Sequence, residues 1–138
     1  MENIAEQLYP DFEDTWGIYD YTPIIKYFGE VLLRKDIGHY QGDTLILYKH
    51  DDGSYSFLAF GWGSCSGCDA LLSCKTLEEV NDLIENLDNK RIIRSSAKEM
   101  LDYFENKDWE SEWYWYEDKA KLTIKNMKEI LKEEFDNE

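Results

Sequence analysis

All three cysteines of the chain lie within ten residues, at Cys65, Cys68 and Cys74, with the spacing C-x2-C-x5-C. In a C-x2-C pair the two intervening residues let the backbone turn back, so that both thiolates can reach one cation. Ser66-Gly67 suits such a turn because glycine tolerates positive φ. With Cys74 as a third thiolate, this segment would supply three ligands of a tetrahedral zinc ion. The spacing therefore predicts a cysteine-rich loop that binds a structural zinc.

Two other roles for the cysteines stay open. Free cysteines also occur as small buried apolar residues, and C-x-x-C also serves thioredoxin-type redox chemistry, although the third cysteine and the missing βαβ pattern argue against that role. The first residues, Met-Glu-Asn-Ile-Ala-Glu, lack the basic start and apolar run of a signal peptide, and no segment is apolar for long enough to span a bilayer. We therefore expect a cytoplasmic protein, in which a structural disulfide is disfavoured.

A β-hairpin is predicted just before the cysteines. Thr44–Lys49 and Tyr55–Phe60 have strand-like composition, and the residues between them, His50-Asp51-Asp52-Gly53-Ser54, are typical of a tight turn. Pairing around this turn makes the numbers of partner residues sum to about 104.

This register suggests the fourth zinc ligand. His39 falls opposite Cys65, one strand spacing away, whereas His50 lies at the turn, more than about 20 Å from the cysteines. We predict His39 as the fourth ligand. Asp69, Asp43 or a water molecule are the alternatives, and His39 would then be an exposed loop residue.

The rest of the chain predicts a single α+β domain over residues 1–138. Val31–Ile37 adds a strand before the hairpin, which gives a three-stranded antiparallel meander, and Arg91–Arg94 is a possible further short strand. Capping residues and helical spacing predict helices that begin near Thr22, Thr76 and Ser96, and a last helix over about Glu117–Phe135. Their core-facing positions are expected at Leu77, Val80, Ile84, Leu87, Met100, Leu101, Phe104, Ala120, Ile124, Met127 and Leu131. We expect these helices on one side of the sheet.

The charge is strongly negative, with 30 acidic and 15 basic residues and a formal net charge of −15. Such a surface repels nucleic acid, anionic lipid and phosphate ligands, and it favours a basic protein partner. The alternative is that the acidity only keeps a small protein soluble.

One acidic group is regularly spaced. Glu78, Asp82 and Glu85 occupy positions i, i+4 and i+7 of a predicted helix, with Glu79 beside them, opposite the apolar stripe. We predict these four residues as partner-binding, although an ordinary solvated helix face has the same pattern.

The segment Asp108–Glu117 alternates large aromatic residues with acids. Its period of two predicts an edge strand with Trp109, Trp113 and Trp115 on one face. Aromatic residues usually belong to a core, but aromatics rimmed by acids also suit a surface for a basic protein. We predict Trp113 and Trp115 as partner-binding.

Motifs of catalysis are absent from the sequence: there is no G-x-S-x-G, no H-E-x-x-H, no Walker loop and no zinc deaminase pattern. Cys65 or Cys68 could pair with His39 as nucleophile and base, but a metal site would use the same residues and also explain Cys74. We therefore expect a binding protein, with a thiol or zinc enzyme as the weaker alternative.

The segment Gly61–Leu71, preceded by Tyr40-Gln41-Gly42-Asp43, resembles a group of small acidic proteins of bacteria and phages over about residues 28–120. That resemblance carries no catalytic assignment. By size, charge and Lys-, Asn- and Ile-rich composition, rather than by an aligned motif, the chain also resembles metal-containing anti-CRISPR proteins of phages that inhibit a type II RNA-guided nuclease. This likeness implies binding to the basic recognition lobe of the nuclease and interference with target DNA loading. The alternative is an immunity or antitoxin-type protein that neutralises a basic toxin or nuclease.

Overall fold

The structure is a computed structural model that describes residues 4–12, 20–38, 41–63 and 69–138. These residues form an α+β fold with a four-stranded antiparallel sheet in the order β1-β2-β3-β4. The strands are β1 (Glu30–Gly38), β2 (Gly42–Lys49), β3 (Tyr55–Trp62) and β4 (Ile92–Arg94). The helices are α1 (Ile4–Leu8), α2 (Thr22–Phe28), α3 (Leu77–Lys90), α4 (Ala97–Asn106) and α5 (Asp118–Asp136).

The predicted hairpin and its register are confirmed. Lys49 pairs with Tyr55, and Gly42 pairs with Trp62 at the far end of the same ladder, so partner numbers sum to 104 throughout. At the turn, the His50 N–H donates to the Ser54 carbonyl at 2.9 Å. Gly53 has a φ of +88°, a conformation that glycine adopts without strain.

A fourth strand extends the predicted three-stranded meander. The possible short strand at Arg91–Arg94 forms as β4, and its three residues pair with Tyr55–Phe57 of β3. So short a strand leaves only a weak pattern in the sequence, and its position depends on where α3 ends.

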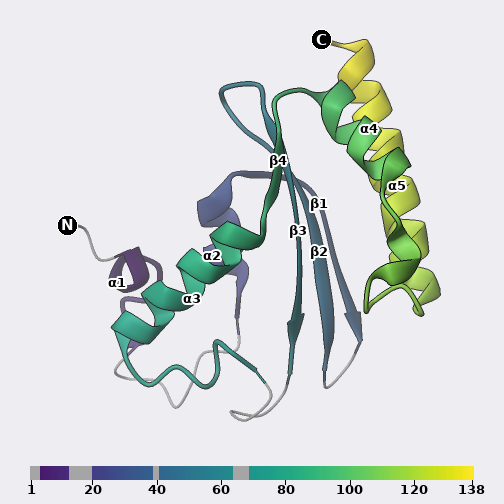
Figure 1. Ribbon diagram of the computed structural model, residues 1–138. Coiled ribbons are helices and arrows are strands. Elements are labelled where there is room, and N and C mark those ends of the chain that lie inside the picture. The colour runs from purple at the N-terminus through teal and green to yellow at the C-terminus, as the bar shows by residue number, and fades with distance from the viewer. Residues whose placement is uncertain (1–3, 13–19, 39–40, 64–68) are drawn as a thin grey trace.

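The prediction that the helices lie on one side of the sheet is wrong. In Figure 1, α1, α2 and α3 lie on one side of the sheet and α4 and α5 on the other. Ile46 and Leu58 pack in the core beneath the first group, whereas Leu45 and Phe57 pack beneath the second. The physical reason is that β2 is apolar on both faces, with six consecutive buried residues, and a strand of this kind must be covered twice.

The predicted helix starts at Thr76 and Ser96 are confirmed by their caps. The side chain of Thr76 accepts from the Glu79 N–H at 3.1 Å, and that of Ser96 accepts from the Glu99 N–H at 3.1 Å. In contrast, α2 begins at Thr22 as predicted but has Tyr21 as its N-cap, with no side-chain cap hydrogen bond. Of the predicted core-facing residues, Leu77 and Leu101 are only partly buried, and the rest are buried. Local capping and spacing therefore determine where these helices form.

The edge strand predicted in the Trp-rich segment is also wrong. Trp109–Ser111 is a 3-10 helix, followed by turns that lead into α5. Trp109 is 7% exposed, and its indole N–H donates to the Phe104 carbonyl at 2.7 Å. This segment covers the core between the sheet, α4 and α5. Burial of its aromatic rings in that core stabilises it more than an edge strand would, despite its alternating sequence.

Candidate functional site

Several of the predicted zinc ligands fall outside the described residues. Cys65, Cys68 and His39 all do so, and the pairing predicted between His39 and Cys65 therefore stays a prediction. Among the residues that the structure does describe, no group of three or more His, Cys, Asp or Glu side chains could hold a metal ion.

Cys74, the remaining predicted zinc ligand, is half-buried in the turn that precedes α3. Its thiol donates to the carbonyl of Ala70 at 3.3 Å. Burial and the charges of Glu79, Asp69 and Asp82 raise the pKa of the thiol. Cys74 is therefore held as a neutral thiol, and a metal would have to displace both its proton and this hydrogen bond.

Asp69, an alternative ligand, is buried at the base of the loop and accepts three hydrogen bonds. The donors are the Tyr21 hydroxyl at 3.0 Å, the Leu72 N–H at 2.9 Å and the Gly63 N–H at 2.9 Å. The Tyr21 hydroxyl in turn accepts from the Leu71 N–H at 3.2 Å. The carboxylate thus links the end of β3, the residue before α2 and the turn after the loop, which indicates a structural role.

Asp43, the other carboxylate candidate, is buried on the opposite face of the sheet. Its Oδ1 accepts from the Trp113 indole N–H at 2.6 Å. Both carboxylate alternatives therefore already have protein donors. A zinc site in this chain would depend on Cys65 and Cys68, and the described residues alone do not form one.

A polar cavity of about 220 Å³ adjoins Asp69. Arg34 lines it, and its guanidinium donates to the Thr22 hydroxyl at 2.8 Å and to Asp36 at 3.3 Å. Hydrogen bonds from Thr22, followed by the nearby charge of Arg34, hold the pKa of Asp20 below its usual range. Arg34 and Asp36 were not among the predicted site residues; the signal for them was the group of charges in the second half of a strand whose first half is apolar after Glu30. Each of these side chains has a protein partner, so the cavity shows no free group for catalysis.

The predicted acidic ridge forms on α3. Glu78, Glu79, Asp82 and Glu85 are all exposed, while Val80 and the rest of the apolar stripe face the sheet. None of the ion pairs found among the described residues involves these four carboxylates. The ridge therefore presents uncompensated negative charge to solvent.

The two predicted tryptophan anchors differ. Trp113 is 56% exposed, whereas Trp115 is partly buried and stacks on Trp109 with ring centroids 5.7 Å apart. Trp113 lies on the side of the sheet that α4 and α5 cover, opposite α3. The predicted partner-binding residues thus belong to two separate surfaces.

The described residues offer little for catalysis. His50 is hydrogen-bonded to the Ser56 hydroxyl at 2.8 Å, but Ser56 is 0% exposed and cannot reach a substrate.

Comparisons of the chain with protein-family models, curated proteins and solved structures find no match.

Proposed function

We propose that this chain is an acidic binding protein that inhibits a basic protein partner by covering its charged surface. The observation that carries the proposal is the outer face of α3, where Glu78, Glu79, Asp82 and Glu85 are exposed and lack ion-pair partners within the described chain. A net charge of −15 adds long-range attraction to any basic partner.

The spacing of the ridge supports a partner that normally binds nucleic acid. Neighbouring carboxylates at i and i+4 or i+3 lie about 5–6 Å apart on a helix, and a duplex carries one negative charge per ~1.7 Å of its axis. A line of carboxylates on a rigid helix can therefore occupy a basic channel built for a nucleic acid backbone. Because the chain resembles anti-CRISPR proteins in size and charge, a type II RNA-guided nuclease is the partner we propose, with target DNA loading as the blocked step.

Zinc belongs to the proposal as a stabiliser of the cysteine-rich loop. Cys65 and Cys68 would hold it, joined by His39 and by Cys74 after loss of its proton. Tetrahedral zinc with four protein ligands is structural and leaves no position for a substrate. This role agrees with a binding protein rather than with an enzyme.

The test reverses the ridge. The variant Glu78→Lys, Asp82→Lys, Glu85→Lys should fold normally, because these positions lie away from the core, and should lose inhibition of target DNA binding by the guide-loaded nuclease. The matched control is Glu129→Lys, Glu133→Lys, Asp136→Lys on α5, which has the same i, i+4, i+7 spacing and also changes exposed residues.

The control variant should inhibit like the original chain, since it changes the net charge by the same amount on the other side of the sheet. Equal loss of inhibition in both variants would mean that inhibition depends on the net charge of the chain and not on the position of the ridge. If DNA loading proceeds normally with excess unmodified chain, across several type II nucleases, the nuclease proposal fails and neutralisation of a basic toxin takes its place.

A further inference from the structure

The edge of β3 beyond β4 lacks a partner strand in the described chain. β3 has eight residues, but β4 pairs only with the first three, Tyr55–Phe57. The remaining residues of β3 pair with β2 on one side only. Among the described residues, the sheet therefore has a short open edge that begins after Phe57.

The register shows which backbone groups point out of this edge. Hydrogen-bonded pairs alternate along an antiparallel ladder, and the bond from His50 to Ser54 sets the alternation. Pairs such as Tyr48 with Ser56 therefore form backbone hydrogen bonds within the β2–β3 ladder. The N–H and C=O groups of the β3 residues that alternate with these pairs point away from β2. Ala59 and Gly61 accordingly direct their N–H and C=O groups toward the open edge.

The opposite edge of the sheet is protected against strand pairing. In β1 the register shifts between Val31 and Leu33, which marks a bulge, and charged residues follow at Arg34, Lys35 and Asp36. Bulges and charges are devices that prevent an edge strand from pairing with another chain. Ala59 and Gly61 carry no such protection.

A cavity of about 320 Å³ lies where β4 leaves β3. Phe57 and Ala59 line one side, and Ile92 and Trp113 line others. The indole of Trp113 is fixed by its hydrogen bond to Asp43, although more than half of its surface is exposed. An exposed aromatic ring held in place is suited to anchor an apolar side chain at low entropic cost.

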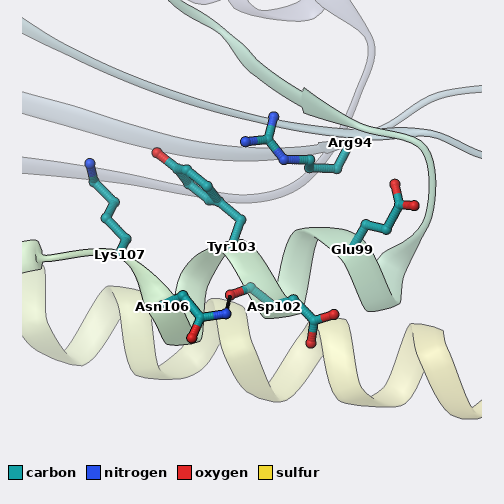
Figure 2. A pocket seen from close by; sticks show the side chains of 6 residues that line it. All are labelled: Arg94, Glu99, Asp102, Tyr103, Asn106 and Lys107. Atoms are coloured by element: carbon teal, nitrogen blue, oxygen red, sulfur yellow. Dashed lines mark hydrogen bonds between the residues drawn. The ribbon is translucent and has the colours of Figure 1, made fainter.

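The first cavity contains a cation that lacks a carboxylate partner among the described residues, and its neighbour holds charges of both signs. An adjoining cavity of about 480 Å³, shown in Figure 2, shares Tyr103 and Lys107 with the first. Lys107 is neutralised by Glu112 at 2.7 Å. Lys90, in the first cavity, has no carboxylate partner among the described ion pairs. Arg94, whose guanidinium lies 4.9 Å from the centre of the Tyr103 ring, shares the adjoining cavity with the carboxylates of Glu99 and Asp102.

Within the described chain, Lys90 is thus an unpaired cation in the first cavity of a protein whose acidic residues outnumber its basic ones by two to one. This groove, the first cavity, therefore attracts an acidic group at Lys90. Repulsion from the distant carboxylates is screened beyond about 8 Å at physiological ionic strength, so the nearest charges decide what binds there.

We propose that the open edge of β3 and this groove bind an extended peptide segment of a partner protein, which adds a strand along Ala59–Gly61. An apolar side chain of the segment packs between Phe57 and Trp113, and an acidic side chain faces Lys90. In strand addition the backbone hydrogen bonds supply affinity, and pockets for alternate side chains supply specificity. The surface is separate from the acidic face of α3 and does not depend on the proposed function.

The experiment uses a phage-displayed library of random dodecapeptides, selected on the full chain. Enriched peptides are synthesised, and their affinities are measured by titration calorimetry. We expect a shared pattern in which an acidic and an apolar residue are separated by one position. Lys90→Glu should weaken binding by about tenfold or more, whereas Lys125→Glu, an exposed lysine on α5, should change it by less than about twofold.

The backbone contact is tested separately. Ala59→Pro removes an N–H that points out of the sheet and should abolish binding, with folding checked by thermal unfolding. In the unmodified chain, peptide binding should slow amide hydrogen exchange at Ala59 and Gly61 by about tenfold or more, and this result does not require the proline variant to fold. Failure of the library to enrich any peptide overturns the proposal. So does binding that is unaffected by Lys90→Glu, or unchanged exchange at Ala59 and Gly61.

Discussion

The backbone N–H of Gly63 donates a hydrogen bond of 2.9 Å to Oδ2 of Asp69. This contact joins the two described residues that flank the segment 64–68, which holds Cys65 and Cys68. Because the Tyr21 hydroxyl bonds to the same carboxylate, the base of the cysteine-rich loop is attached to the core beside α2. The two residues that flank this segment are thus held together by a buried carboxylate.

Asp69→Ala should destabilise the protein strongly. It leaves three donors without an acceptor, in one buried and two partly buried hydrogen bonds, and we expect a loss of about 3 kcal/mol in the free energy of unfolding, measured with urea. Asp51→Ala, at an exposed turn position, is the control and should change it by less than about 0.5 kcal/mol. A similar result for both variants would contradict the anchoring role of Asp69.

Zinc binding is predicted at about one ion per chain by elemental analysis. Cys65→Ser and Cys68→Ser should each lower both the metal content and the melting temperature. The apo protein should remain folded, because Leu71 and the partly buried Cys74 are the only described residues of the loop that belong to the two cores. His39→Ala should weaken zinc retention, and full retention in that variant would leave Asp69, Asp43 or water as the fourth ligand. A metal-free chain whose melting is unchanged by both cysteine variants would rule the site out.

Trp109 and Trp113 should respond differently to truncation. Trp109→Ala removes a buried ring from the core, and we expect a loss of about 3–5 kcal/mol in unfolding free energy. Trp113→Ala removes a largely exposed ring and one hydrogen bond to Asp43, and we expect a loss of about 1–3 kcal/mol. Chemical denaturation of both variants measures the difference, and equal losses would contradict the assignment of Trp113 to the surface.

His50 should make the protein less stable as the pH falls. Burial and the charge of Arg91 lower the pKa of this imidazole in the folded state. The unfolded chain therefore binds the proton more readily, and the contribution of neutral His50 to stability is present above the unfolded pKa of about 6.5 and is lost below it. We expect His50→Gln to flatten the fall in unfolding free energy between pH 7 and pH 5.

Denaturation with urea at both pH values measures this effect, and an NMR titration of the ring gives the pKa directly. A pKa above that of a free histidine would contradict the prediction, as would identical pH dependence in the variant and the original chain.

Local features of this protein were predictable from its sequence. The hairpin register follows from the turn His50–Ser54 and the alternation beside it, and the helix starts follow from Thr76 and Ser96. The acidic ridge on α3 could also be predicted, because spacing along one helix determines which side chains share a face. In each case the interacting residues are close in the chain.

Contacts between distant residues were decided only by the tertiary structure. Tyr21 and Asp69 are 48 positions apart, and Asp43 and Trp113 are 70 apart. No local pattern pairs them, because their contact depends on how α2 and the Trp-rich segment pack against opposite faces of the sheet. The same packing turned the alternating segment near Trp109 into a 3-10 helix and turns, since burying its aromatic rings against α4 stabilises it more than an edge strand would. Sequence periodicity showed which face of each element is apolar. The burial of β2 on both faces determined on which side of the sheet each helix lies.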